Sequence, residues 1–258
     1  MLKIGDATAA LERFAPLPLQ EEYDNCGLIY GDPKKELKGV TVSLDLTVSV
    51  VEEAAENGSN LIVTHHPVVF RPIRSLNPVR PEHVALTNAI KRDIAVYAAH
   101  TNVDKAPGGL SETVLGLLGA RVPEQGAALP KFGYFEKPVA LKELYGRVVE
   151  KLGDERAAYV GDPGKLVSKV ALITGAGGDE ESLRTAVDAG ADVFLSGEFK
   201  YHVIRFAKDA DYAIISFGHF ESEKLFTSLA AKVLSESGIS PVRESACEEN
   251  PFTTEGRS

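Results

Sequence analysis

The feature that most constrains this chain is an order of strand-like and helix-like segments that occurs twice. The first copy runs from the β-rich GVTVSLDL to the strand Ile94–His100, and the second runs from the strand Val170–Thr174 to the strand Tyr212–His219. Alternating strands and helices predict mostly parallel sheets that are covered by helices. We therefore expect an α/β fold with two similar β-α-β-α-β halves, related by an internal pseudo-repeat.

The two copies can be aligned without large gaps. ENGSNLIVTHH pairs with DAGADVFLSGE, and IAVYAAHTNVD pairs with YAIISFGHFESE. The segment between the copies is rich in glycine and proline, and it predicts one helix at most, over Val139–Leu152. We expect a first α/β half at residues 1–120, a connecting subdomain at 121–168 and a second α/β half at 169–258.

Charge and composition exclude several classes of protein. The net charge of −9 and the pI near 5.3 argue against binding of duplex nucleic acid, although a small anion could still bind at a local cationic site. The N-terminal MLKIGDATAALERF has acidic residues where a signal peptide needs an apolar core, and no apolar run approaches the roughly 20 residues of a membrane span. We expect a cytoplasmic protein without a membrane partner.

Four histidines and two carboxylates lie at or just after the ends of expected strands. In open α/β sheets the ligand crevice lies beyond the carboxyl ends of the strands, so these side chains could converge. Imidazoles and carboxylates without a thiolate suit Zn, Fe, Mn, Co or Ni, and six donors exceed the needs of one tetrahedral ion. We expect two divalent metal ions per chain, sharing a carboxylate bridge. The candidate ligands are His65, His66, His100, Asp104, His219 and Glu223.

Two further groups are candidates for binding or catalysis. Glu198 and His202 occupy the position of the second copy that corresponds to His65 and His66, and they could transfer protons or orient a ligand. They could equally be an ordinary pair on one helix face. Arg71, Arg74 and Arg80 follow the histidine pair and could hold a phosphate, or they could form a solvated loop.

The chain contains six segments in this order: DNCGLIYGD, VTHHPVVFRPIRSL, AAHTNVDKAPGG, VALITGAGGD, LSGEFKYH and GHFESE. Together they resemble the GTP cyclohydrolase 1 type 2 homologues, which are also described as NGG-interacting-factor-like proteins. The resemblance implies that the six candidate ligands hold a dinuclear metal centre and that the chain forms a homohexamer, in the short form without an inserted domain. Tyr23 and Cys26 depart from the tryptophan and valine that are usual in this family.

Such a centre predicts hydrolysis. A water molecule bound to a divalent ion has its pKa lowered toward ~7 and becomes a nucleophile at neutral pH. We expect a metal-dependent hydrolase that uses a metal-bound hydroxide on a nucleotide or related small anion, in a cyclohydrolase-like or a phosphoester reaction. The alternative is a metal-handling oligomeric scaffold without turnover, because the same residue types serve both roles. An open coordination position would distinguish the hydrolase.

Overall fold

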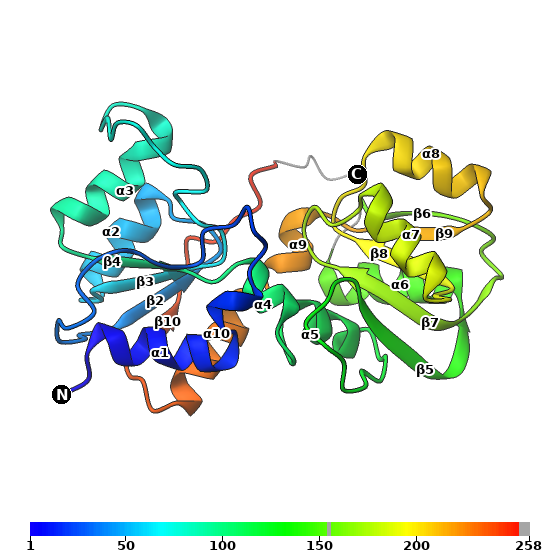
Figure 1. Cartoon of the computed structure of the whole chain (residues 1–258), viewed down its shortest axis with the longest axis horizontal. Helices are drawn as coiled ribbons and strands as arrows, with labels where there is room; N and C mark the ends of the chain where they lie inside the picture. The colour runs from blue at the N-terminus through cyan, green and yellow to red at the C-terminus, as the bar shows by residue number, and fades with distance from the viewer. Residues whose placement is uncertain (154–155, 253–258) are drawn as a thin grey trace. The chain divides into compact units, whose positions relative to one another are not determined.

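The protein folds into two compact units, each built around a five-stranded sheet (Figure 1). The computed structural model describes residues 1–153 and 156–252, and of Glu82 only the main chain. Unit 1 joins Met1–Val103 to the chain from Phe226 onward, and unit 2 is Asp104–Leu225. Among the described residues, no helix has the length and apolar character needed to cross a bilayer.

Unit 1 contains a sheet in the order β1-β4-β3-β2-β10, in which only β1 runs antiparallel to its neighbour. Helices α2 and α3 cover one face of this sheet, and α1 and α10 cover the other (Figure 1). Its elements are α1 (Ile4–Phe14), a 3-10 turn (Leu17–Leu19), β1 (Gly27–Tyr30), β2 (Val40–Ser43), α2 (Val48–Glu56), β3 (Leu61–Thr64), α3 (Pro81–Lys91), β4 (Ala95–Ala98), α10 (Phe226–Glu236) and β10 (Val242–Glu244). The short helix α4 (Thr101–Lys105) spans the boundary to unit 2.

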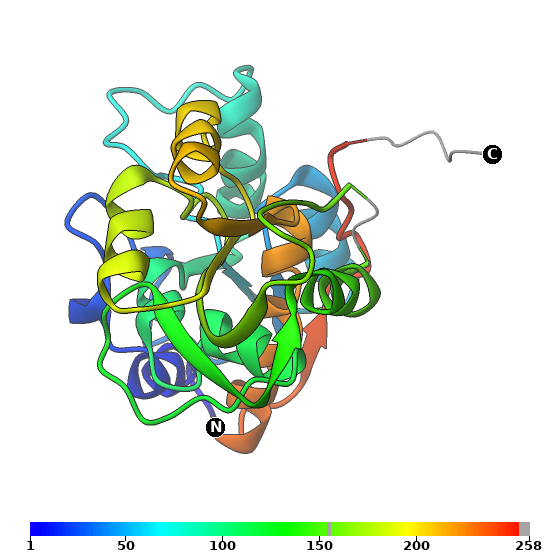
Figure 2. The same ribbon diagram turned by 90° about the vertical axis from the view of Figure 1, so that its right-hand side faces the viewer.

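Unit 2 contains a sheet in the order β5-β7-β8-β9-β6, with a parallel centre and an antiparallel strand at each edge. Figure 2 shows the yellow helices α7 and α8 on the opposite face of this sheet from the green helix α6. Its elements are α5 (Leu110–Leu117), β5 (Lys131–Ala140), α6 (Leu141–Leu152), β6 (Ala158–Val160), β7 (Leu166–Ile173), α7 (Glu180–Asp188), β8 (Val193–Ser196), α8 (Tyr201–Asp209), β9 (Ala213–Ser216) and α9 (His219–Glu223).

The central strands of unit 2 are buried on both faces. In β7, Val170 and Leu172 pack with α5 and α6, whereas Ala171 and Ile173 pack with α7 and α8. Successive side chains of a strand point to opposite faces, so a strand between two helical layers needs apolar residues at every position. This requirement explains the uninterrupted apolar runs that predicted these strands.

The internal repeat is confirmed by the two parallel sheet centres, β2-β3-β4 and β7-β8-β9. The turns after the middle strands also match. The amide of His66 donates to the Leu44 carbonyl oxygen at 3.0 Å, and the amide of Glu198 donates to the Gly175 carbonyl oxygen at 2.9 Å. His66 and Glu198 therefore occupy equivalent positions, as the alignment of the copies predicted.

The division of the chain differs from the expected ranges 1–120, 121–168 and 169–258. The stretch 121–168 is not a separate connecting subdomain, because it supplies β5, α6 and β6, whose strands form both edges of the unit 2 sheet. The chain from Phe226 onward returns to unit 1, where β10 pairs with β2 and α10 packs on the sheet. Strand pairing across long sequence separations decides both boundaries, and local sequence patterns do not report it.

Truncation of Leu172 should test the two-sided burial of β7. Leu172 is fully buried, whereas Leu166 at the start of the same strand is 63% exposed. We expect Leu172→Ala to lower the free energy of unfolding by about 2–5 kcal/mol, and Leu166→Ala to change it by less than about 0.5 kcal/mol. Denaturant unfolding monitored by circular dichroism measures both, and equal effects would contradict this packing.

Candidate metal centre

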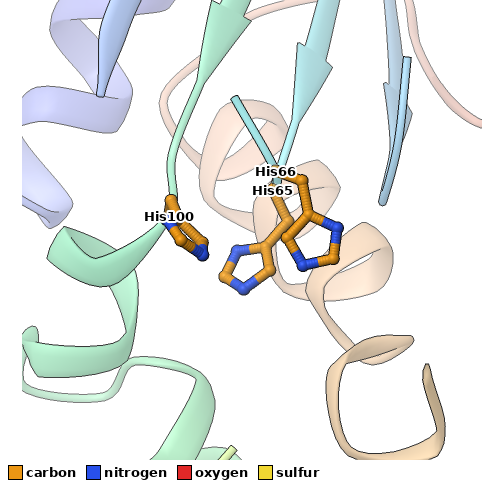
Figure 3. A group of neighbouring side chains, drawn as sticks. All are labelled: His65, His66 and His100. Atoms are coloured by element: carbon orange, nitrogen blue, oxygen red, sulfur yellow. The ribbon is translucent and has the colours of Figure 1, made fainter. Parts of the chain in front are cut away.

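Three histidines meet at the carboxyl ends of two neighbouring parallel strands in unit 1. His65 and His66 follow β3 directly, and His100 lies two residues beyond the end of β4. Parallel neighbours end at the same edge of a sheet, which brings these side chains together. One ring nitrogen of each histidine lies within 4.8 Å of a ring nitrogen of both others (Figure 3). Side chains of this kind at this spacing can hold a divalent metal ion.

Each ring of this histidine group has its Nδ1 hydrogen-bonded to an oxygen. A carbonyl or carboxylate oxygen only accepts, so Nδ1 is the donor in each contact. The lone pair of each ring then lies on Nε2, which is the nitrogen that a metal ion would bind. The contacts join His65 to the Ala99 carbonyl oxygen (2.8 Å), His66 to Asp45 Oδ1 (2.9 Å) and His100 to Asp24 Oδ1 (2.9 Å).

Asp24 is the buried anchor of His100, and its side chain is 0% exposed. Besides the His100 ring, it accepts from the amide of Asn25 at 2.8 Å, the amide of Thr101 at 3.1 Å and the Thr101 hydroxyl. Burial by itself raises the pKa of this carboxyl, but the hydrogen bonds that it accepts from His100 and Thr101 outweigh that effect. The pKa therefore lies well below its usual range, and Asp24 is a carboxylate.

Cys26 also contacts this anchor. Its Sγ lies 3.3 Å from Asp24 Oδ2, and burial raises the pKa of the thiol to about 12. The thiol is therefore protonated near neutral pH and donates to the carboxylate. The thiol of Cys26 therefore supplies one more donor to the carboxylate that orients His100.

Unit 2 contains a second group of donors on α9. His219 and Glu223 lie four residues apart on this helix, and His219 Nε2 is 2.9 Å from Glu223 Oε2. His219 Nδ1 contacts Glu198 Oε1 at 3.1 Å, which repeats the arrangement of the three histidines in unit 1. A bare Nε2 lone pair and a carboxylate oxygen repel each other at this distance unless a proton or a cation lies between them. This pair therefore also fits a metal ion.

Asp104 and Gly175 complete the polar surroundings in unit 2. Asp104 is 6% exposed, lies on α4 and accepts from the hydroxyl of Thr174 at 3.1 Å. Gly175 follows Thr174 with a φ of +61°, and a Cβ there would lie 2.1 Å from Oε1 of Glu223. The tight turn after β7 thus needs glycine both for its left-handed backbone and for the space that the Glu223 carboxylate occupies.

The other predicted site residues take different positions. Arg71 and Arg74 lie in an exposed loop after His66, and His202 is exposed on α8. We expected Glu198 at the start of a helix. It lies before the helix instead, because α8 begins only at Tyr201. The segment before α8 instead pairs with the chain around Gly178, which accounts for the later start of the helix.

Sequence reasoning missed Asp24 and Asp45 as the anchors of His100 and His66. The sequence position of Asp45 could have revealed its role, because Asp45 follows β2 at the same edge of the sheet as the histidines. The sequence position of Asp24 is less informative, since Asp24 lies in the turn-rich DNCG segment and contacts His100 only in the folded chain. From the sequence, both residues were indistinguishable from aspartates that stabilise ordinary turns.

Replacing Asp24 by asparagine should weaken metal binding without removing a ligand. An asparagine side chain has only one acceptor oxygen, so it cannot accept from all of the donors that surround the Asp24 carboxylate. The His100 ring then loses its fixed orientation. We expect the affinity for Zn²⁺ to fall about 10- to 100-fold, as is typical for such supporting residues. Competition with a chromophoric chelator measures this, and Asp32→Asn, at an exposed aspartate of the same unit, is the control. Equal affinities of the two variants would exclude the anchoring role.

Comparison with known proteins identifies the family of this chain. A protein from Clostridium perfringens named GTP cyclohydrolase 1 type 2 homolog is 32% identical over 230 residues, which cover 86% of this chain and 87% of that protein. A protein of the same name from Campylobacter jejuni is 33% identical and covers 90% of this chain and 92% of its own length. The crystal structure of the Staphylococcus aureus hypothetical protein SA1388 superposes with a TM-score of 0.88 over 98% of this chain and 99% of that one, at 24% identity.

The family model for Duf34/NIF3 (NGG1p interacting factor 3) matches residues 2–251, which is nearly the whole chain. The match includes all of the candidate ligands and both of the missed aspartates. The resemblance seen in the sequence motifs is thereby confirmed, and the chain belongs to the Duf34/NIF3 (NGG1p interacting factor 3) family.

Proposed function

We propose that this protein is a dinuclear metal-dependent hydrolase that acts on a nucleotide or a related small anion. One observation carries the proposal: all four candidate ligand histidines have Nδ1 against an oxygen acceptor. A histidine held in this way has its metal-binding nitrogen selected and its ring orientation restricted. Four such rings are difficult to attribute to chance. The names of the relatives, GTP cyclohydrolase 1 type 2 homolog, support hydrolysis of a nucleotide.

The proposal assigns all six candidate ligands to one centre with two divalent ions. The assignment follows the chemistry of the donors, because four imidazoles and two carboxylates exceed the needs of one tetrahedral ion. The two carboxylates, Asp104 and Glu223, would neutralise two of the four positive charges, so the centre would attract an anionic substrate even in a protein with net charge −9.

Each group of residues has a distinct part in the proposed reaction. When bound, the ions would supply Lewis acidity and a water molecule of lowered pKa. Asp24, Asp45 and Glu198 keep the histidine rings oriented, which holds the centre rigid. Glu198 is 58% exposed and is our candidate, together with His202, for moving protons during turnover.

The remaining roles concern substrate binding and assembly. Arg71 and Arg74 lie in the exposed loop that follows the histidine pair, and we assign them to the anionic group of the substrate. We also propose that the protein assembles as a homohexamer and is located in the cytoplasm. The metal ion could be Zn, Fe, Mn, Co or Ni, because imidazole and carboxylate donors serve all of them.

The metal content of histidine variants tests the centre. Purified protein should contain about two divalent ions per chain, and His65→Ala and His219→Ala should each lose metal, because each removes one imidazole from a different group. His83→Ala is the control, since His83 lies on α3 outside both groups. Elemental analysis measures the ions, and thermal unfolding verifies that each variant is folded. Unchanged metal content in both ligand variants would contradict the assignment.

Turnover by the metal-loaded protein tests the reaction. We expect release of formate or phosphate from GTP or from another nucleotide or phosphoester, with complete loss after chelation. With excess metal in the assay, so that the natural protein and the variant are both fully loaded, Glu198→Gln should lose at least about 100-fold in kcat, as is typical when a proton-transfer group is removed. Unaltered turnover would remove Glu198 from the mechanism. Two bound ions with no turnover of any compound would favour the metal-handling scaffold instead.

A further inference from the structure

We propose that the exposed rings of Tyr23 and Phe70 form a stacking surface that binds the planar aromatic ring of the substrate beside the histidine group of unit 1. The substrate class is then an aromatic heterocycle that carries an anionic group. This inference rests on the proposed function, because it concerns the same site, but it depends on residues to which that function assigns no role.

Both rings are exposed at the edge of the histidine group. Tyr23 is 65% exposed and Phe70 is 41% exposed, and their ring centroids lie 6.0 Å apart at an angle of 57°. The Phe70 ring also packs against the His100 ring, with centroids 6.1 Å apart at 79°. The pair therefore extends outward from a candidate metal ligand, with aromatic area left in contact with solvent.

The two rings are held in position by the residues next to them. The side-chain amide of Asn25 donates to the Val69 carbonyl oxygen at 2.6 Å, which ties the segment around Tyr23 to the segment around Phe70. The neighbouring Asp24 is itself fixed by its bonds to His100 and Thr101. Each ring thus belongs to a residue adjacent to an anchored one, so the aromatic pair is part of the same hydrogen-bonded structure as the histidine group.

The chemistry around the pair favours an anionic heterocycle. Arg71 and Arg74 are exposed cations that follow Phe70 within four residues in the same loop. Aromatic side chains bind nucleobases and similar heterocycles through their faces, and removing one such ring weakens binding of a base by about 5- to 150-fold. A flat ring for stacking and an anion for the arginines are together the features of a nucleotide.

A single tryptophan provides a direct test of stacking, because the natural chain contains none. In the metal-loaded Phe70→Trp protein, GTP should quench tryptophan fluorescence, whereas inorganic triphosphate at equal occupancy should not. The two ligands share the polyphosphate and differ in the nucleoside. Equal responses to GTP and inorganic triphosphate would overturn the stacking surface.

Affinities of a second set of variants separate stacking from other effects. Tyr23→Ala and Phe70→Leu should each weaken GTP binding at least about 5-fold in equilibrium dialysis and change inorganic triphosphate binding less than about 2-fold. Phe70→Tyr should bind GTP as the natural protein does, since it keeps the ring. Val79→Ala is the matched control, because Val79 is an aliphatic residue of the same loop with 80% exposure.

The outcomes distinguish this inference from the proposed function. If the natural protein binds both ligands and the ring variants bind GTP unchanged, the stacking surface is wrong and the anion-binding centre stands. If the metal-loaded natural protein binds neither GTP nor inorganic triphosphate, the nucleotide-directed function fails and the stacking surface fails with it. Metal content measured for every variant must equal that of the natural protein for these comparisons to hold.

Discussion

The hydrogen bond from the Nδ1 of a histidine to an oxygen acceptor is the interaction on which the candidate centre depends. It occurs at His65, His66 and His100 in unit 1, and at His219 in unit 2. Each bond selects the tautomer in which Nε2 has the lone pair, and each limits rotation of the ring. The acceptors come from a main-chain carbonyl and from three carboxylates, so the fold must bring several separate segments to one edge of each sheet.

The parallel sheets supply this arrangement. Strands that run side by side in the same direction end at the same edge of the sheet, so the residues that follow each strand lie at that edge. In unit 1 this edge holds the ends of β2, β3 and β4, followed by Asp45, by the histidine pair and by His100. The strands themselves are mostly apolar because helices cover both faces, and their histidine and carboxylate neighbours come only after the strands end. The transition from core to site is therefore abrupt in the sequence.

The repeat shows how one local structure can serve two chemical purposes. The turn after β3 presents His66, and the equivalent turn after β8 presents Glu198. The first residue is a candidate ligand, whereas the second orients the ring of His219 through its carboxylate. The backbone geometry of the turn is retained in both units, and the side chain decides whether the position offers a donor nitrogen or holds one in place.

The sequence by itself determined the α/β class, the repeated order of strands and helices, and the concentration of donors at strand ends. These properties follow from local periodicity and from the identity of residues within a few positions of one another. Only the tertiary structure decided that Asp24 holds His100, that the chain from Phe226 returns to unit 1 and that 121–168 supplies two edge strands of unit 2. Each of these depends on contacts between residues that are distant in the chain, and the free energy of such contacts comes from packing and hydrogen bonding that no short segment encodes.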